Sequence, residues 1–252
     1  TISMLNSPNF ENVMSRADDK VIISIRNLTS AQLTGIKAMM SCFSGKHADW
    51  IVSLSERVKQ DQIDNFKTPI EKSVTIYNPC NYKSIEMQAK QEIEDSFFVE
   101  LRNRTDCLVM TAGRCTYQKG QWHMIRSFKN VVEKKPEAIL VILGKGDMDE
   151  ALDKLILEMN LEKNVFKLGF KKNIYAYLWN ADIFVFSSIF EGFGNILLEA
   201  MACELPIISC DCKAGPRELL APNSNQQSQA KSIEFEEFGI LTPPMNGKIY
   251  RA

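Results

Sequence analysis

The chain alternates short, continuous apolar runs with longer helix-prone stretches, and this alternation constrains its fold more than any other feature. The clearest runs are CLVMTAG at 107–113, AILVILG at 138–144, NVFKLGF at 164–170 and DIFVFSS at 182–188. A strand that is apolar on both faces needs a layer on each side, and helices between successive strands make those strands parallel. We therefore predict an α/β fold with a Rossmann-like parallel sheet covered by helices on both faces.

The same alternation continues on either side of these runs. We expect further strands at 20–25, 50–55, 73–79, 206–210 and 238–242, and helices near 31–43, at 121–133, at 148–159 and from Asn195. Residues 83–104 are charged and low in glycine and proline, which favours a helix. We assign 1–84 to a partial N-terminal Rossmann-like domain, 85–105 to a linker helix and 106–252 to a C-terminal domain.

The overall charge is close to zero, because 30 lysines and arginines face 31 aspartates and glutamates. That balance argues against non-specific binding of nucleic acid, which needs a basic surface. No apolar run approaches the roughly 20 residues that cross a bilayer. The seven cysteines show no disulfide or metal-binding spacing. We therefore expect a cytoplasmic protein with reduced thiols.

Ligands of parallel α/β sheets bind beyond the carboxyl ends of the strands, so residues that follow a predicted strand are candidates for a site. Arg114 and Lys119 follow the run at 107–113 and precede a helix. Two cations beside the positive end of a helix dipole suit a diphosphate. A solvated basic loop would contain the same two residues, and this alternative stays open here.

The stretch GKGDMDE at 144–150 follows the next strand. Asp147 is expected to cap the helix behind it, with Glu150 as the partner in a capping box. Asp147 and Asp149 also form an Asp-x-Asp pattern, which can hold a divalent cation on a sugar nucleotide. We favour the cap, because it explains the acidic residues without a metal.

The stretch FEGFGNILLEAMA at 190–202 follows the run at 182–188. Two helical turns separate Glu191 from Glu199, so both can face one wall of a cleft. A carboxylate accepts two hydrogen bonds and suits a pair of ribose or sugar hydroxyls. Gly192 and Gly194 would let a ligand approach the backbone. The alternative is that Glu191 lies on the surface and Glu199 only compensates the helix dipole.

Together these stretches resemble the retaining glycosyltransferases of family 4, which have the GT-B fold. The matching motifs are GRCTYQKG (113–120), VILGKGD (141–147), KLGF (167–170), ADIFVFSSIFEGFGNILLEAMA (181–202) and GPREL (215–219). The residues around GPREL further resemble enzymes that build bacterial surface polysaccharides and lipid-linked oligosaccharides. Glu204 stands where the family has glycine, so we expect an altered turn there.

The resemblance implies a role for each matched residue. Arg114 and Lys119 would hold the donor diphosphate and Glu191 would contact the donor sugar, and these three are the expected catalytic residues. Glu199 would bind the ribose hydroxyls. The other expected donor-binding residues are Gly113, Gly169, Phe170, Gly192, Phe193, Gly194 and Asn195, with Gly215–Glu218 near the pocket. Such enzymes generally need no metal or other cofactor.

The resemblance also implies a reaction. A hexose or N-acetylhexosamine would move, with retention, from a nucleoside-diphosphate sugar, first of all a UDP-sugar, to a glycan or lipid-linked acceptor. A lipid-linked acceptor would bring a cytoplasmic enzyme to the inner face of the membrane as a peripheral protein. The alternatives are a non-catalytic nucleotide-sugar-binding module, a GT-B sugar-nucleotide epimerase and a metal-dependent transferase.

The same resemblance suggests that the sequence is a fragment. Residues 1–84 match only the second half of an acceptor-side domain, and the closing C-terminal helices of the family are missing. Whether the chain completes transfer by itself is left open by the sequence.

Overall fold

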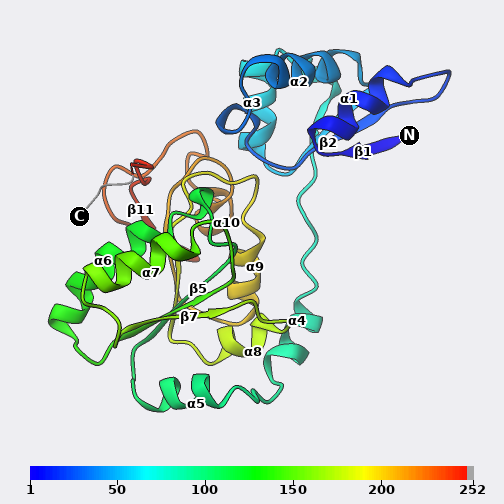
Figure 1. Cartoon of the computed structure of the whole chain (residues 1–252). Helices are drawn as coiled ribbons and strands as arrows, with labels where there is room; N and C mark the ends of the chain where they lie inside the picture. The colour runs from blue at the N-terminus through cyan, green and yellow to red at the C-terminus, as the bar shows by residue number, and fades with distance from the viewer. Residues whose placement is uncertain (249–252) are drawn as a thin grey trace.

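The computed structural model describes residues 1–248 and contains one parallel and one mostly parallel sheet, each with its own helices (Figure 1). The N-terminal sheet has four strands in the order β1-β2-β3-β4, all paired in parallel. Its strands are β1 (Ile2–Met4), β2 (Ile22–Ile25), β3 (Trp50–Ser53) and β4 (Ser73–Thr75), and its helices are α1 (Asn6–Met14), α2 (Gly35–His47) and α3 (Glu56–Phe66). The predicted strands of this half are confirmed in shorter form, whereas β1 and α1 were not predicted, and α2 starts four residues later than the predicted helix.

The C-terminal sheet has seven strands in the order β10-β11-β9-β8-β5-β6-β7. The strands are β5 (Leu108–Ala112), β6 (Ile139–Leu143), β7 (Val165–Gly169), β8 (Ile183–Phe186), β9 (Ile207–Cys210), β10 (Glu234–Glu236) and β11 (Gly239–Thr242). All neighbours pair in parallel except β10 with β11, which form an antiparallel edge. The predicted α/β class and the six predicted strands of this half are confirmed.

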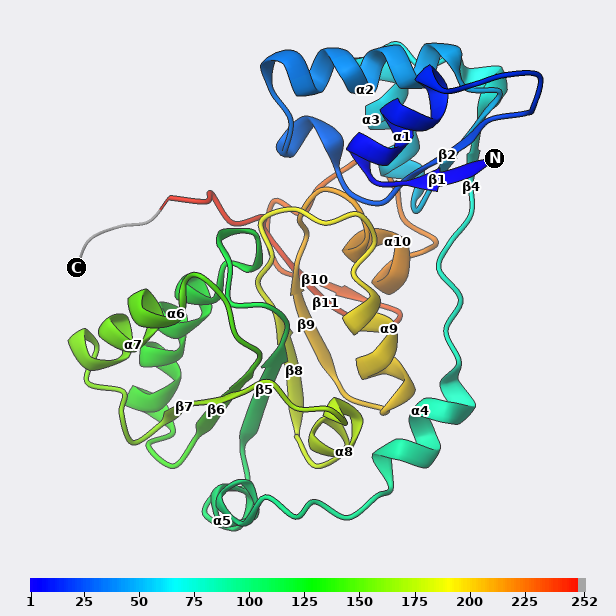
Figure 2. The same ribbon diagram turned by 45° about the vertical axis from the view of Figure 1, so that its right-hand side comes forward.

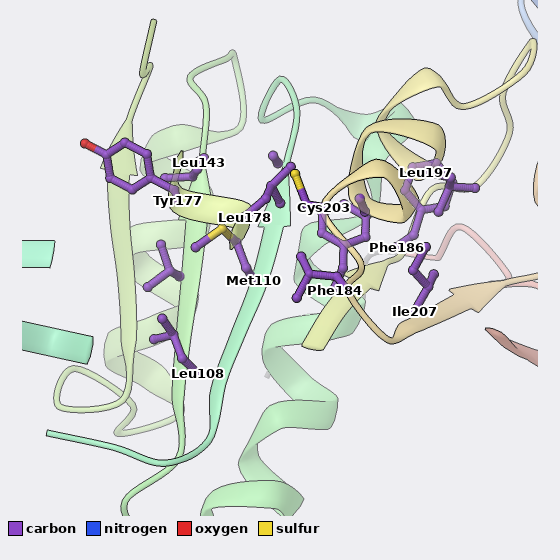
Figure 3. Packing of buried hydrophobic residues seen from close by; sticks show 14 of the residues in the cluster. Leu108, Met110, Leu143, Tyr177, Leu178, Phe184, Phe186, Leu197, Cys203 and Ile207 are labelled. Atoms are coloured by element: carbon purple, nitrogen blue, oxygen red, sulfur yellow. The ribbon is translucent and has the colours of Figure 1, made fainter. Parts of the chain in front are cut away.

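Alternate residues of the central strands pack into two separate clusters, one on each face of the sheet. Val109 and Leu140 belong to the cluster under α6 (Gln121–Lys134) and α7 (Asp149–Glu158). Leu108, Met110 and Phe184 belong to the other cluster (Figure 3). That cluster is covered by α8 (Ile174–Trp179), α9 (Asn195–Ala202) and α10 (Pro216–Leu220). A side-chain period of two therefore explains why these strands are apolar throughout.

The segment predicted as one linker helix over 85–105 contains two short helices, α4 (Tyr82–Ala89) and α5 (Ser96–Asn103). The prediction of a single helix is wrong because Asp95 starts a new helix, with its carboxylate accepting a hydrogen bond from the backbone N–H of Phe98 at 3.2 Å. Both helices bury apolar side chains against the C-terminal sheet. An extended stretch connects β4 to α4 (Figure 2).

Two local expectations also fail. The N-cap of α7 is Met148 rather than Asp147, and the carboxylate of Asp149 accepts from the Gly146 N–H at 3.1 Å instead. The turn at Glu204 keeps the conformation of a glycine, because Glu204 closes α9 with a φ of 57°. A left-handed residue at this position costs about 1 kcal/mol when it is not glycine. Within residues 1–248, no helix is long and apolar enough to cross a membrane.

Candidate active site

The strand order of the C-terminal sheet reverses between β5 and β8, which lie side by side although two other strands, β6 and β7, come between them in the sequence. At such a switch point the loops beyond the two strands turn to opposite sides and leave a crevice. Arg114 follows β5, and Glu191 follows β8. The fold therefore brings together two loops that the sequence places more than seventy residues apart.

A cavity of about 560 Å³ lies over this switch point, between the two domains. Of the predicted catalytic residues, Arg114, Lys119 and Glu191 all line it. The predicted donor-binding residues that line it are Gly113, Phe170, Gly192, Phe193, Gly194, Asn195 and Glu199. Arg26, Asn27 and Asn78 line it from the N-terminal domain.

Lys119 and Glu191 form a largely buried ion pair inside this cavity. The Nζ of Lys119 lies 2.6 Å from Oε1 of Glu191, and the two side chains are 18% and 9% exposed. The Ser188 hydroxyl donates to the same carboxylate oxygen at 2.8 Å. A surface position for Glu191 is therefore wrong, and of the predicted basic loop Lys119 is largely buried whereas Arg114 is exposed. An ammonium group has three donors, so Lys119 keeps others for a ligand.

Arg114 differs from Lys119 because its charge is not balanced. Within residues 1–248, its guanidinium makes no hydrogen bond or ion pair, while its backbone carbonyl accepts from the side-chain amide of Gln121 at 3.1 Å. Lys145, which follows β6, is a second exposed cation at the cavity with no side-chain partner in the same range. A cavity with unbalanced positive charge favours an anionic ligand.

Glu199 projects from α9 into the same cavity, about one turn after the helix begins at Asn195, whereas Glu191 lies in the loop before the helix, so the expected two-turn helical separation is wrong. Burial raises the pKa of its carboxyl group, and a hydrogen bond from the Tyr175 hydroxyl partly opposes that rise. No cation pairs with this carboxylate within the described residues. A desolvated carboxylate without a cation is a strong acceptor for hydroxyl groups, because it gains most from new hydrogen bonds.

Glycine is favoured at positions 192 and 194 of the FEGFGN stretch for different structural reasons. A side chain at Gly192 would overlap the backbone carbonyl of Arg26 in the other domain. Gly194 is the N-cap of α9 and has a left-handed φ of 86°. Between them, Phe193 stacks on Tyr77, which lies in the extended stretch between β4 and α4, with ring centroids 5.2 Å apart. The loop is therefore shaped by the N-terminal domain as well as by the cavity that it lines.

Two expectations about the site need correction. Gly169 does not line the cavity; it lies beneath Lys145, whose Cε would be 3.0 Å from a Cβ at this position, while the neighbouring Phe170 is 75% exposed. None of the residues 215–218 lines the cavity either. Glu218 instead hydrogen-bonds to the N-terminal domain.

The sequence interpretation missed several cavity residues. Lys145 and Arg26 directly follow the predicted strands at 138–144 and 20–25, so the strand-end rule could have identified both. Asn78 carries no such signal. Its amide donates to the side-chain carbonyl of Asn195 at 2.7 Å and accepts from Arg26 at 3.0 Å, which only the packing of the two domains brings about.

The Asp-x-Asp pattern does not converge on the cavity. Neither Asp147 nor Asp149 lines it, and the Asp149 carboxylate lies 3.3 Å from the Nζ of Lys167. Across the described part of the chain, no three His, Cys, Asp or Glu residues form a group that could hold a metal ion.

Comparison with known proteins identifies the class. Residues 92–233 match the family described as glycosyl transferases group 1, which is more than half of the chain. The chain belongs to this family, and its two domains facing one cavity have the GT-B fold.

Individual relatives agree with this assignment. The chain is 37% identical over 203 residues to an uncharacterized glycosyltransferase of Methanocaldococcus jannaschii, covering 80% of this chain and 49% of that protein. It is 31% identical over 246 residues to the N-acetylgalactosamine-N,N'-diacetylbacillosaminyl-diphospho-undecaprenol 4-alpha-N-acetylgalactosaminyltransferase of Campylobacter jejuni, covering 94% of this chain and 60% of that one. The chain thus spans about half the length of the curated relatives it matches.

Solved structures show the same fold. The crystal structure of Anabaena HepE in complex with UDP superposes with a TM-score of 0.76 at 18% identity, covering 96% of this chain and 65% of that chain. Sucrose-phosphate synthase of Thermosynechococcus elongatus superposes with a TM-score of 0.75 at 18% identity, covering 98% and 61%.

Proposed function

We propose that this chain forms the donor-binding part of a hexosyltransferase that moves a hexose or N-acetylhexosamine from a UDP-sugar to a glycan or lipid-linked acceptor, with retention. The observation that carries the proposal is the cavity at the β5/β8 switch point. It combines the free cation Arg114, the paired Lys119 and Glu191, and the desolvated carboxylate of Glu199. This set matches the chemistry of a nucleoside-diphosphate sugar, which is anionic in the middle and rich in hydroxyls at both ends.

Each group has a proposed role at the donor. Arg114 and Lys119 bind the diphosphate and stabilise the charge that develops as UDP departs, which is where fixed cations accelerate such a reaction most. Glu199 accepts hydrogen bonds from the ribose hydroxyls. Oε2 of Glu191 makes no hydrogen bond within residues 1–248 and accepts from a hydroxyl of the donor sugar. Phe170 and its neighbours frame the base.

The contacts of Glu191 favour this binding role over covalent attack. Its Oε1 is occupied by both Lys119 and Ser188, and a cation beside a carboxylate lowers its nucleophilicity. The acceptor hydroxyl would then approach from the face that the UDP leaves, and the departing phosphate would take its proton. No metal ion is needed in this scheme, because the cations are side chains.

The choice of donor and acceptor rests on the relatives. Anabaena HepE was crystallised with UDP and with UDP-glucose, and the name of the Campylobacter jejuni relative specifies a diphospho-undecaprenol acceptor. By analogy we propose a UDP-sugar donor and a glycan or lipid-linked acceptor for this chain. An enzyme with a lipid-linked acceptor would work in the cytoplasm at the inner face of the membrane.

Proton NMR of one reaction mixture tests the proposal. The complete gene product is incubated with UDP-glucose or UDP-N-acetylglucosamine and a mixed glycan acceptor. We expect release of UDP and a new α-anomeric signal from an α-linked donor. A changed sugar still linked to UDP would indicate an epimerase. Binding of UDP without any turnover would indicate a non-catalytic module, and absence of both would reject the donor site.

A further inference from the structure

The GPREL motif lies outside the donor cavity, yet it contacts the N-terminal domain. Glu218 in α10 places its carboxylate on the first turn of α3. Oε2 accepts from the backbone N–H of Glu56 at 2.9 Å, and Oε1 accepts from that of Arg57 at 3.1 Å. Both oxygens of one carboxylate thus bridge the two domains.

This contact completes the N-terminus of α3. The first backbone N–H groups of a helix have no partner inside the helix. Ser55 satisfies the N–H of Val58 through its side chain at 3.1 Å and that of Lys59 through its carbonyl at 3.0 Å. Glu218, from the other domain, supplies acceptors for the N–H groups of Glu56 and Arg57. Separating the domains would leave these two N–H groups and the Glu218 carboxylate without their partners.

The same carboxylate is connected to the loop at 190–194 that lines the cavity, which we call the donor loop. The Tyr77 hydroxyl donates to Oε2 of Glu218 at 3.1 Å, and the Tyr77 ring stacks on Phe193. Burial, followed by the nearby Glu218 charge, raises the pKa of Tyr77 to about 12, so its hydroxyl remains a donor at working pH. A side chain at Gly215 would overlap the backbone carbonyl of Phe193, so the start of α10 also packs directly on that loop.

A buried charge network fixes α10 in this position. Arg217, 6% exposed, donates through Nε and Nη2 to Asp211 at 2.8 and 2.6 Å, and Nη2 also bonds Glu234 at 2.6 Å. Because Arg217 is adjacent to Glu218, this anchor sets the direction from which Glu218 reaches α3. The motif therefore has one anchored residue and one that crosses to the other domain.

We propose that Glu218 is a positioning residue, which holds the N-terminal domain against the donor loop so that Arg26 and Asn78 stand at the cavity. The inference rests on the proposed function for its effect on turnover, but the contact itself is independent of any substrate. In the absence of Glu218, the link between α10 and α3 is lost, and the N-terminal wall of the pocket is held less firmly by the remaining interdomain bonds of Asn78 to Asn195 and of Arg57 to Gln227.

Amide exchange and small-angle scattering on the 252-residue chain test the contact without substrate. In E218A, we expect the Glu56 and Arg57 amides to exchange about tenfold faster, since a charge-assisted hydrogen bond is lost, and the radius of gyration to increase. The matched control is E237A, because within residues 1–248 the Glu237 carboxylate accepts only from Asn223, which lies in its own domain. Unchanged exchange and an unchanged radius in E218A would overturn the proposal.

Calorimetry and kinetics separate this proposal from the assignment of the donor site. We expect UDP to bind E218A within about twofold of the parent, because the proposed UDP contacts lie in the C-terminal domain. In the complete enzyme, we expect kcat to fall at least tenfold with a nearly constant KM for the donor, and E218Q to recover part of kcat, because its carbonyl oxygen still accepts. A normal kcat in E218A would overturn the positioning role. Failure of the parent to bind UDP would reject the donor site and leave the exchange result intact.

Discussion

The two domains contribute to the cavity in different ways. The C-terminal domain presents charged groups on loops that follow adjacent strands of one sheet, as with Arg114 and Glu191. The N-terminal domain presents Arg26 and Asn78, and Asn78 is held by a hydrogen bond from its own amide to Asn195. One wall is thus set by the topology of a single sheet, whereas the other is set by the packing of two domains. Substitutions on the two walls should therefore change different properties of the protein.

The largest effect is expected at the buried ion pair of the C-terminal wall. K119M leaves Glu191 buried without its cation, which should lower the free energy of unfolding by about 3 kcal/mol. Urea denaturation of the 252-residue chain measures it, with K163M at an exposed lysine as the control. The double variant K119M/E191Q should recover part of the loss. A K119M protein as stable as K163M would show that the pair contributes nothing to the fold.

The next largest effect is expected where the two domains touch, and it distinguishes the interdomain contact from the C-terminal domain itself. G192A adds a methyl group that overlaps the Arg26 carbonyl. We therefore expect the free energy of unfolding to fall by about 2 kcal/mol, as for an overpacked interior. We also expect a larger radius of gyration. G194A serves as the control, because the atoms nearest to a Cβ there belong to Leu197 and Phe186 in its own domain. It should cost stability through its left-handed φ but leave the radius unchanged. Equal radii for both variants would contradict the close interdomain contact.

Glu199 offers a test that depends on pH. Because burial raises its pKa, the charged carboxylate costs folding free energy at pH values above the folded pKa and costs none below the ordinary value. E199Q should therefore be more stable than the parent at pH 7, and the gain should vanish in acid. If the carboxylate binds ribose, UDP affinity of the parent should fall as pH decreases toward that raised pKa, and that of E199Q should be weak and flat. Equal pH profiles would remove Glu199 from the ribose site.

The smallest effect concerns a position far from both walls. Glu204 holds a φ of 57° that suits glycine, so E204G should stabilise the chain by up to about 1 kcal/mol. UDP affinity and the radius of gyration should not change. Thermal unfolding measures the gain, and a loss of stability would mean that the Glu204 side chain has a role that its backbone does not explain.

The charged wall could be predicted from sequence because it obeys local rules. Apolar runs located the strands, and the residues behind two of them included Arg114 and Glu191. The same rule would have yielded Lys145 and Arg26. The order of the strands, which makes β5 and β8 neighbours, does not follow from periodicity.

The other features depend on contacts between residues distant in the chain. Asn78 has no motif, and its place follows from Asn195 more than a hundred residues later. Glu218 was placed near the pocket on resemblance, but its partners are the N–H groups of α3. The linker was predicted as one helix because propensity alone does not show that Asp95 caps a second one.

Calorimetric titration of UDP into the 252-residue chain tests the donor site most directly. We compare the parent with R114A, which removes a cation that has no partner within residues 1–248 and so should leave the fold unchanged. K163A is the control for charge. Loss of a charge-assisted bond to the diphosphate should weaken UDP binding by about 2 kcal/mol, or roughly thirtyfold, while K163A binds as the parent does. Equal affinity of R114A and the parent for UDP would contradict the assignment of this cavity to the donor.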